Sequence, residues 1–243
     1  MDKKKFFTML LEGLALFGIV CLATVMRVNA YRDDPALSRD GFLYLMQTED
    51  ILNGKIKKNG QPQLYQWLVA QNIRLTGWST EVAAVSVNIA AGVLGIIPIW
   101  LLARHLFVSL IPAFLAAVGM VFWPPLVKIS IEAQRESCYL LAFCWLLYWL
   151  FRHNQQSWFS AVLGGALLAV GTHFRWEMLE FIPIIGAMWG WQWFRNKFPR
   201  RLIVRQSLVL GGSFISILLA VAWSIAPGYL SLFLKNFGGR FGL

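Results

Sequence analysis

Charged residues are scarce in this sequence, and acidic residues are the scarcer kind. Only 14% of the 243 residues are charged and 58% are hydrophobic, whereas about a quarter of a typical soluble domain is charged. Three segments, 82–103, 106–127 and 206–234, contain no Asp, Glu, Lys or Arg at all. About 20 apolar residues suffice for a helix to cross the hydrocarbon core of a bilayer. The composition therefore excludes a soluble globular domain and predicts membrane-spanning helices.

Several catalytic motifs are also absent, and cysteine and histidine are few. The sequence has no HExxH, paired CxxC, GxSxG or P-loop pattern, which removes the enzyme classes that depend on them. The three cysteines, Cys21, Cys138 and Cys144, offer no disulfide framework and are interpreted as small apolar residues. Of the three histidines, only His173 falls on the predicted outer side, so a histidine-rich metal centre is not expected.

The apolar segments predict the fold class. Shorter or lightly interrupted apolar runs lie at 6–26, 137–151, 158–174 and 178–194. Backbone polar groups in lipid must be satisfied within the segment, which favours helices for all of these runs. We therefore expect an all-α polytopic membrane protein with about seven transmembrane helices, forming one domain over residues 1–243.

Basic residues predict the orientation of these helices. If the helices alternate in direction, one side of the membrane receives Lys3, Lys4, Lys5, Arg104, Arg152, Arg195, Lys197, Arg200, Arg201 and Arg205. Short loops rich in Lys and Arg stay cytoplasmic, so the N-terminus is predicted inside. The net charge of +10 is thus explained by orientation, and nucleic acid is not an expected partner. The chain is expected in a plasma, inner or endoplasmic-reticulum membrane.

The N-terminus resembles a secretory signal, because "MDKKKFF" precedes an apolar run and "VNA" at 28–30 mimics a cleavage site. The run is long for a signal peptide, and Arg27 precedes the small residues. An uncleaved anchor is therefore expected.

A long polar segment, 27–79, is predicted to form an outer loop with two helices. One helix is expected at 40–53, ending at "NG", and another at 63–76, ending before Gly77. Both are too short and too polar to cross a bilayer, which favours helices lying at the membrane interface. Ser79 or Thr80 is expected to cap the next helix, and residues 227–243 are expected as an outer tail.

Acidic residues concentrate on the predicted outer side. All acids except Asp2 and Glu12 fall there: Asp33, Asp34, Asp40, Glu49, Asp50, Glu81, Glu132, Glu136, Glu177 and Glu180. Arg39, Lys128, Arg135 and Arg175 lie close to them in sequence. Ionisable groups at a membrane boundary are costly, so a cluster of both signs indicates a functional site. Tolerance of acids in outer loops is the alternative explanation.

Five segments carry a resemblance to a known family: "SRDGFLYL…ILNGK", "QPQLYQWLVAQNIRLTG", "AAGVLGIIPIWLLARHLF", "SIEAQRESCYLLAF" and "GTHFRWEMLEFIP". In this order they resemble the GT-C glycosyltransferases, and more narrowly glycosyltransferase family 39 and the protein mannosyltransferase-like group. The resemblance covers residues 10–195 and makes the chain look like a short member. Asp40 stands at the family's acidic position and Tyr44 at its aromatic one, whereas Gln63 and Gln66 stand where prolines are common.

The resemblance implies transfer of a sugar from a polyprenyl-phosphate carrier to a protein, lipid or glycan acceptor on the outer side, with inversion. Phosphate leaves without a general acid, so one carboxylate suffices to deprotonate the acceptor hydroxyl. Asp40 is the expected base, with Asp33 and Asp34 as reserves. The alternative role of Asp40 is to cap the helix that follows it.

Further roles follow from the same resemblance. Arg135 and Arg175 are expected to hold the carrier phosphate, because guanidinium groups match its oxygens. The remaining candidates bind substrate or orient these arginines: Glu136, Glu177, Glu132, Tyr44, Lys128 and Arg39. No metal ligands are assigned; the residue spacing demands no metal, although a divalent ion is compatible with it.

Two functions without transfer remain open from the sequence. One is a non-catalytic membrane subunit that binds the lipid carrier. The other is a flippase or transporter for a lipid-linked sugar, for which paired broken helices and ionisable residues near the membrane midplane are typical.

Overall fold

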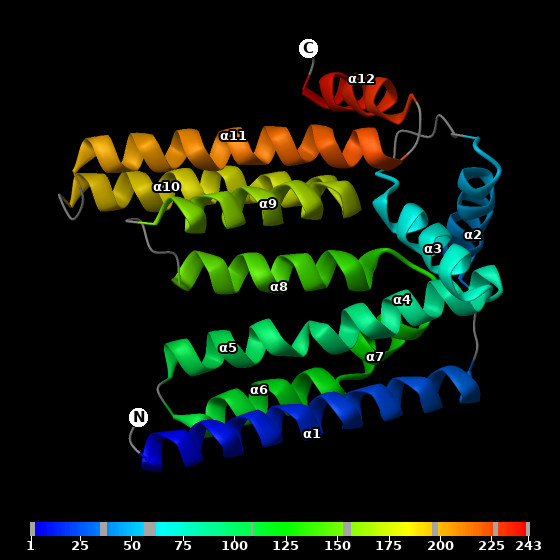
Figure 1. Cartoon of the computed structure of the whole chain (residues 1–243), viewed down its shortest axis with the longest axis horizontal. Coiled ribbons are helices and arrows are strands. Elements are labelled where there is room, and N and C mark those ends of the chain that lie inside the picture. Colours follow the sequence, from blue (N-terminus) through cyan, green and yellow to red (C-terminus); the bar gives the residue numbers. More distant parts are fainter. Residues whose placement is uncertain are drawn as a thin grey trace. The chain divides into compact units, whose positions relative to one another are not determined.

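The structure is a computed structural model that describes residues 3–34, 38–55, 62–107, 109–152, 157–195, 199–225 and 228–241 (Figure 1). These residues form helices and no strand. The α-helices are α1 (Lys3–Asp33), α2 (Arg39–Leu52), α3 (Leu64–Thr76), α4 (Thr80–Leu94), α5 (Ile96–Leu106), α6 (Leu110–Phe122), α7 (Pro124–Ile131), α8 (Glu136–Arg152), α9 (Trp158–Phe174), α10 (Phe181–Phe194), α11 (Arg200–Ile225) and α12 (Tyr229–Phe241), with a 3₁₀ helix η1 (Trp176–Glu180). His153 and Lys197, both predicted cytoplasmic, lie outside the described residues.

Three helical segments are long and apolar enough to cross a membrane: Phe6–Asp33, Thr80–Leu106 and Arg200–Ile225. The second of these comprises α4 and α5. A fourth candidate is the pair α6 and α7, which bend by 54° at Trp123. The described chain is therefore all-helical with three or four candidate spans, and the expected number of about seven crossings stays a prediction.

The predicted end of the first helix was wrong, and two of the apolar runs contain a break. The first helix does not end near residue 26 but continues to Asp33, so the expected outer loop does not begin at residue 27. The apolar run 106–127 is not one helix, because Pro124 and Pro125 lack the N–H groups that would continue α6. The run 206–234 also divides: α11 ends at Ile225, and a further helix occupies most of the predicted tail 227–243.

By contrast, the helices predicted at 40–53 and 63–76 are confirmed as α2 and α3. Gly77 ends α3 with φ 71°, a left-handed conformation that glycine adopts without steric cost. Ser79 caps α4, since its side chain accepts a hydrogen bond from the Val82 N–H at 3.5 Å. The interfacial position of α2 and α3 stays a prediction.

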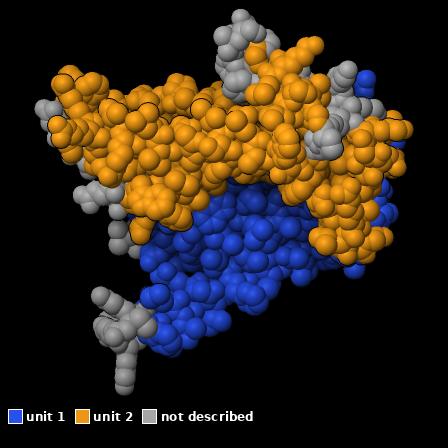
Figure 2. Space-filling view, turned by 45° about the horizontal axis from the view of Figure 1, so that its top comes forward, with its two compact units in different colours: residues 1–45, 78–148 blue, residues 46–77, 149–243 orange. Residues whose placement is uncertain are grey.

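The described chain divides into two compact units. Unit 1 comprises Met1–Leu45 and Trp78–Tyr148, and unit 2 comprises Met46–Gly77 and Trp149–Leu243 (Figure 2). The boundaries fall within α2 and α8 and between α3 and α4.

The core of unit 1 joins α1, α4, α5 and α6. Three fully buried alanines, Ala23, Ala113 and Ala117, belong to this cluster together with Ile96 and Trp100, and their small side chains let the helix backbones approach closely. Outside this core, Arg104 and Glu12 form an ion pair with 2.8 Å between Nη2 and Oε1. Both residues were predicted on the cytoplasmic side.

The packing of α9 against α11 defines unit 2. Gly164 contacts the Trp149 indole, whose Nε1 donates to the Ser160 carbonyl at 2.6 Å. Gly165 lies against the main chain of α11, and a Cβ atom there would overlap the Leu210 carbonyl. These two glycines therefore set how closely α9 approaches its neighbours.

Candidate functional site

The N-terminus of α2 places Asp40. The Ser38 hydroxyl caps this helix by accepting a hydrogen bond from the Gly41 N–H at 3.0 Å. Ser38 thus fills the capping role that was the alternative interpretation of Asp40. Asp40 lies in the first turn with its side chain exposed, and its carboxylate makes no hydrogen bond or ion pair within the described part of the chain. It is available to react.

Tyr44 connects the Asp40 segment with Arg135. Tyr44 follows Asp40 by four residues, so both lie on the same face of α2. The Arg135 Cζ lies 5.7 Å from the centroid of the Tyr44 ring, in a cation–π contact. The structure therefore brings Arg135 to the side of α2 that carries Asp40.

Arg135 has unused hydrogen-bonding capacity. Its Nε and Nη1 atoms are buried, and neither finds an acceptor among the described residues. A guanidinium has five N–H donors in a planar fork, and leaving buried donors unsatisfied costs free energy. An anionic group placed beside Tyr44 would satisfy them.

The loop before Arg135 is fixed by hydrogen bonds. Gln134 Nε2 donates to Ser38 Oγ at 2.7 Å and to Glu132 Oε2 at 2.6 Å. The Glu132 carbonyl in turn accepts from the Asn88 side chain of α4, and its carboxylate lies 3.8 Å from Lys128 Nζ. Glu132 is thus a structural partner of this loop, and Gln134 attaches the loop to the start of α2.

Sequence reasoning missed Ser38, Asn88 and Gln134. Ser38 had a local signal, since a serine directly before a predicted helix is a typical cap. The other two are uncharged amides, and each has a partner distant in the chain, Glu132 for Asn88 and Ser38 for Gln134, so no local pattern could identify these contacts.

Glu136 begins α8 directly after Arg135. It lies in the first turn of α8, where the partial positive charge of the helix N-terminus stabilises a carboxylate. The other candidates near this site are exposed: Arg39, Asp33, Asp34 and Lys128.

Arg175 and Glu177 form a separate pair in unit 2. Arg175 ends α9 in an extended conformation, and η1 begins with the next residue. Two parallel contacts join the side chains, at 2.9 Å between Nη2 and Oε1 and 3.3 Å between Nε and Oε2. Glu177 therefore orients the guanidinium of Arg175. Because this pair and Arg135 belong to different units, a shared pocket stays a prediction.

The Arg175–Glu177 turn is held by buried aromatic residues. Trp176 stacks on Phe233 of α12 with 4.9 Å between ring centroids, and Phe233 also lies 4.6 Å from the His173 ring. His173 contacts the Leu218 carbonyl at 2.9 Å through Nε2. His173 is thus a packed residue between α9, α11 and α12.

The two glutamines that replace common prolines make contacts a proline could not make. The Gln63 N–H donates to the Tyr229 hydroxyl at 3.0 Å, whereas proline has no N–H. Gln66 is buried and donates to Gln47 Oε1 at 2.6 Å. Burial raises the pKa of Tyr229, so its hydroxyl is neutral at physiological pH. The contacts of Gln63 and Gln66 therefore contribute to the packing of unit 2.

Potential metal ligands are dispersed in this structure. Across the described ranges, no three His, Cys, Asp or Glu side chains come close enough to hold one metal ion together.

Comparison with known proteins gives one match. The family model for dolichyl-phosphate-mannose-protein mannosyltransferase matches residues 60–225, which include Arg135, Glu136, Arg175 and Glu177. Asp40 and Tyr44 precede the matched segment. No curated protein and no solved structure matches the chain. The family match confirms the resemblance to GT-C glycosyltransferases, and since it covers more than half of the sequence, the chain belongs to the dolichyl-phosphate-mannose-protein mannosyltransferase family.

Proposed function

We propose that this protein is a membrane glycosyltransferase that moves a sugar from a polyprenyl-phosphate carrier to an acceptor hydroxyl on the non-cytoplasmic side. The family description names a lipid-phosphate sugar donor and a protein acceptor. The donor class follows from this description together with the guanidinium groups of the candidate site. The acceptor is a protein, lipid or glycan hydroxyl.

The reaction needs one proton acceptor. The acceptor oxygen attacks the anomeric carbon while the bond from that carbon to the phosphate oxygen breaks, and the bonding pair leaves with the phosphate. Asp40 takes the proton from the attacking hydroxyl as general base. Attack opposite the leaving phosphate inverts the anomeric centre. A glycosidase, by comparison, requires two carboxyl groups around the bond.

The observation that carries this proposal is the environment of Arg135. Two buried nitrogens of its guanidinium lack acceptors among the described residues, and the group contacts Tyr44 one helical turn from Asp40. A phosphate bound to these N–H groups would place the bond to be broken near the proposed base. Charge-assisted hydrogen bonds of this kind are about twice as strong as neutral ones.

Other residues take supporting roles in the proposal. Arg175, oriented by Glu177, contacts a second oxygen of the carrier phosphate. Glu136 contacts a sugar hydroxyl or orients Arg135, and Glu132 positions the Arg135 loop through Gln134. The exposed Lys128 and Arg39 attract the anionic donor. Asp33 and Asp34 are the alternative bases.

The proposed orientation places the N-terminus in the cytoplasm, with about seven crossings and with α2 and α3 at the outer interface. The ion pair of Glu12 with Arg104 supports this orientation, because it joins two residues that the charge rule places on the same side.

The test is transfer by the purified full chain in proteoliposomes that contain a radiolabelled polyprenyl-phosphate sugar. Release of polyprenyl phosphate together with labelled acceptor would support the proposal. If the carrier binds but no sugar is transferred to hydroxyl acceptors of any of the three classes, the protein is the non-catalytic subunit.

Transport is the second function to be separated in this experiment. The bend between α6 and α7 resembles the broken helices of transporters. In transporters such breaks occur in corresponding positions of two repeats, and the described residues contain one bent pair. Movement of the labelled carrier across the bilayer without sugar transfer would favour the transporter and contradict the proposal.

A further inference from the structure

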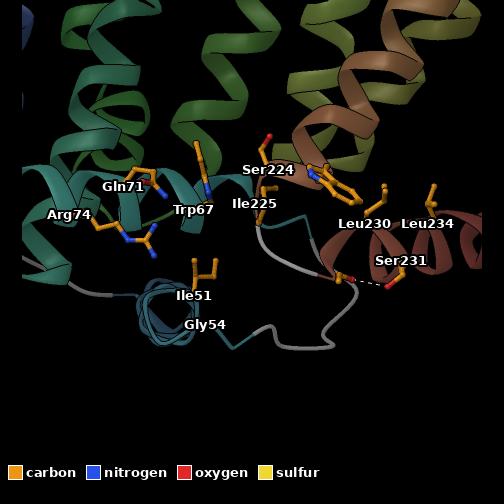
Figure 3. A pocket seen from close by; sticks show the side chains of 12 residues that line it. Ile51, Gly54, Trp67, Gln71, Arg74, Ser224, Ile225, Leu230, Ser231 and Leu234 are labelled. Carbon is orange, nitrogen blue, oxygen red and sulfur yellow. Dashed lines mark hydrogen bonds between the residues drawn. The ribbon is translucent and has the colours of Figure 1, made fainter.

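Unit 2 contains an open groove that the proposed reaction does not use. It has a volume of about 750 Å³ and is bounded by the end of α2, by α3, by the end of α11 and by the start of α12 (Figure 3). Buried Ile51 and Ile225 contribute to its wall, and the exposed Trp223 and Leu234 line its opening. The volume is in the range of about 300–1,000 Å³ found for small-molecule sites.

One cation stands in this otherwise apolar groove. Among the described residues that line it, Arg74 alone is ionisable, and the other polar groups are one amide, two serine hydroxyls and two indole N–H groups. With the Gln71 amide oriented to accept, its oxygen receives hydrogen bonds from Arg74 Nη1 at 3.0 Å and from Trp67 Nε1 at 3.3 Å. Gln71 therefore holds one edge of the Arg74 guanidinium, and the other N–H groups are available to a ligand.

The position of the groove selects the type of ligand. It lies at the C-terminal end of α11, one of the candidate membrane spans. The end of a span is expected to lie where the hydrocarbon core meets the lipid headgroups. Trp67 and Trp223 line it, and tryptophan is enriched at this depth of a membrane. The ligand must therefore be an amphiphile, with its apolar chain along the α11–α12 wall and its polar head at Arg74.

Charge complementarity then identifies the head. A guanidinium binds phosphate oxygens in pairs, and the described residues of the lining include no carboxylate that would bind the ammonium of a zwitterionic headgroup. We infer that this groove binds an acidic glycerophospholipid of the surrounding membrane, with its phosphate on Arg74. This inference is independent of sugar transfer and would hold if the chain proved to be non-catalytic.

The test compares lipid binding to the purified, delipidated full chain by native mass spectrometry. The two lipids are dioleoyl phosphatidylglycerol and dioleoyl phosphatidylcholine, which share acyl chains and differ in net charge. We expect one phosphatidylglycerol molecule to bind at least about fivefold more tightly than phosphatidylcholine. Both lipids carry the phosphodiester that Arg74 would bind, but the ammonium of phosphatidylcholine would be repelled by the guanidinium and finds no carboxylate in the described part of the lining. Equal binding of the two lipids would overturn the inference.

Variants assign the binding to the groove. Arg74→Gln should remove the preference for phosphatidylglycerol. Ser231→Trp, which fills the groove from its exposed edge, should weaken the binding of both lipids. Arg32→Gln is the matched control, because Arg32 is an exposed arginine on α1 in the other unit. Size-exclusion chromatography verifies that each variant is monodisperse. A preference that survives Arg74→Gln, or that is lost in Arg32→Gln, would refute the assignment.

A third lipid separates the membrane phospholipid from the sugar carrier. Undecaprenyl phosphate also presents anionic phosphate oxygens, as a phosphate monoester on a single prenyl chain. We expect it to compete with phosphatidylglycerol weakly and to bind undiminished to Arg74→Gln. Stronger binding of undecaprenyl phosphate than of phosphatidylglycerol, with loss in Arg74→Gln, would show that the groove holds the carrier and would overturn the inference.

Discussion

The guanidinium of Arg27 in α1 donates a hydrogen bond to the main-chain carbonyl of Met120 in α6, with 3.0 Å between Nη2 and the oxygen. In an uninterrupted helix this carbonyl would accept from the N–H of residue 124. Residue 124 is a proline and has no N–H, and the helix axis bends there by 54°. A fully buried arginine from another helix thus supplies the donor that the proline lacks.

This relationship predicts an energetic coupling between Arg27 and the prolines. Arg27→Met removes the donor, whereas Pro124→Ala with Pro125→Ala restores a main-chain N–H for the Met120 carbonyl. Arg27→Met should therefore be better tolerated in the double-alanine background, by about 1 kcal/mol of unfolding free energy. The free energies are measured by denaturant unfolding in detergent micelles. Strictly additive effects would contradict the relationship.

Asp40→Asn should abolish the proposed transfer without affecting the fold. Asp40 is exposed and its carboxylate makes no hydrogen bond or ion pair to a described residue, so its replacement by the isosteric Asn should leave packing intact. Loss of a general base lowers the rate by about 10²–10⁴-fold. The measurement is sugar transfer in proteoliposomes, with carrier binding as the folding control. Asp33→Asn and Asp34→Asn are the matched variants. If Asp40→Asn keeps full activity and one of these two variants loses it, the general base is Asp33 or Asp34 and not Asp40.

Arg135 should determine the affinity for the carrier phosphate. Arg135→Gln removes the N–H groups that lack acceptors among the described residues, and we expect the Kd for polyprenyl phosphate to rise by about ten- to a hundredfold. Arg135→Lys keeps the charge but not the planar fork of N–H donors, so its Kd should lie between that of the unchanged protein and that of Arg135→Gln. Titration of purified protein gives the Kd. Arg32→Gln, at an exposed arginine on α1, controls for loss of charge, and an equal effect there would argue against specific binding by Arg135.

Gln134 should affect the affinity for the carrier by positioning Arg135. Its amide donates to Ser38 and to Glu132, so Gln134→Glu replaces a donor by a carboxylate facing another carboxylate. We expect carrier affinity to fall several-fold, since like charges repel at this distance, while Glu132→Gln in the same chain should restore part of the loss. If Gln134→Glu alone has no effect on affinity, the loop does not position Arg135.

The extent to which sequence predicts this fold depends on whether the signal is local. Gly77 and the polar residues of 63–76 identified α3 because helix ends have local chemistry. The end of α6 at Trp123 was also locally encoded, in "FWPPL", because the two prolines lack main-chain N–H groups. Hydropathy measures only transfer into lipid, whereas continuity of a helix also requires main-chain donors.

The contacts of the candidate site depend on tertiary structure. Nothing in the sequence near Tyr44 indicates that Arg135 will lie over its ring, or that Gln134 will reach Ser38 across 96 positions of the chain. The sequence pattern could select residue types suited to phosphate binding. Only the folded structure shows which of these residues keep N–H groups without an acceptor among the described residues. Arg135 keeps two such groups, whereas Arg175 donates to Glu177.

Glycine substitutions should distinguish a close helix contact from an open helix surface. Gly165 of α9 lies against the main chain of α11, where a Cβ atom would overlap the Leu210 carbonyl and approach the Phe214 nitrogen to 2.8 Å. Main-chain atoms cannot rotate away, so Gly165→Ala should lower the free energy of unfolding by about 1–3 kcal/mol. Gly211 of α11 has no atom within 4 Å of the equivalent position.

Gly211→Ala is therefore the matched control on the partner helix. It should leave stability unchanged or raise it by up to about 1 kcal/mol, because alanine favours the helical conformation. Thermal unfolding of both variants in detergent, followed by tryptophan fluorescence, gives the comparison. If Gly165→Ala proves as stable as Gly211→Ala, α9 and α11 are further apart than in this structure, and the contact that defines unit 2 is wrong.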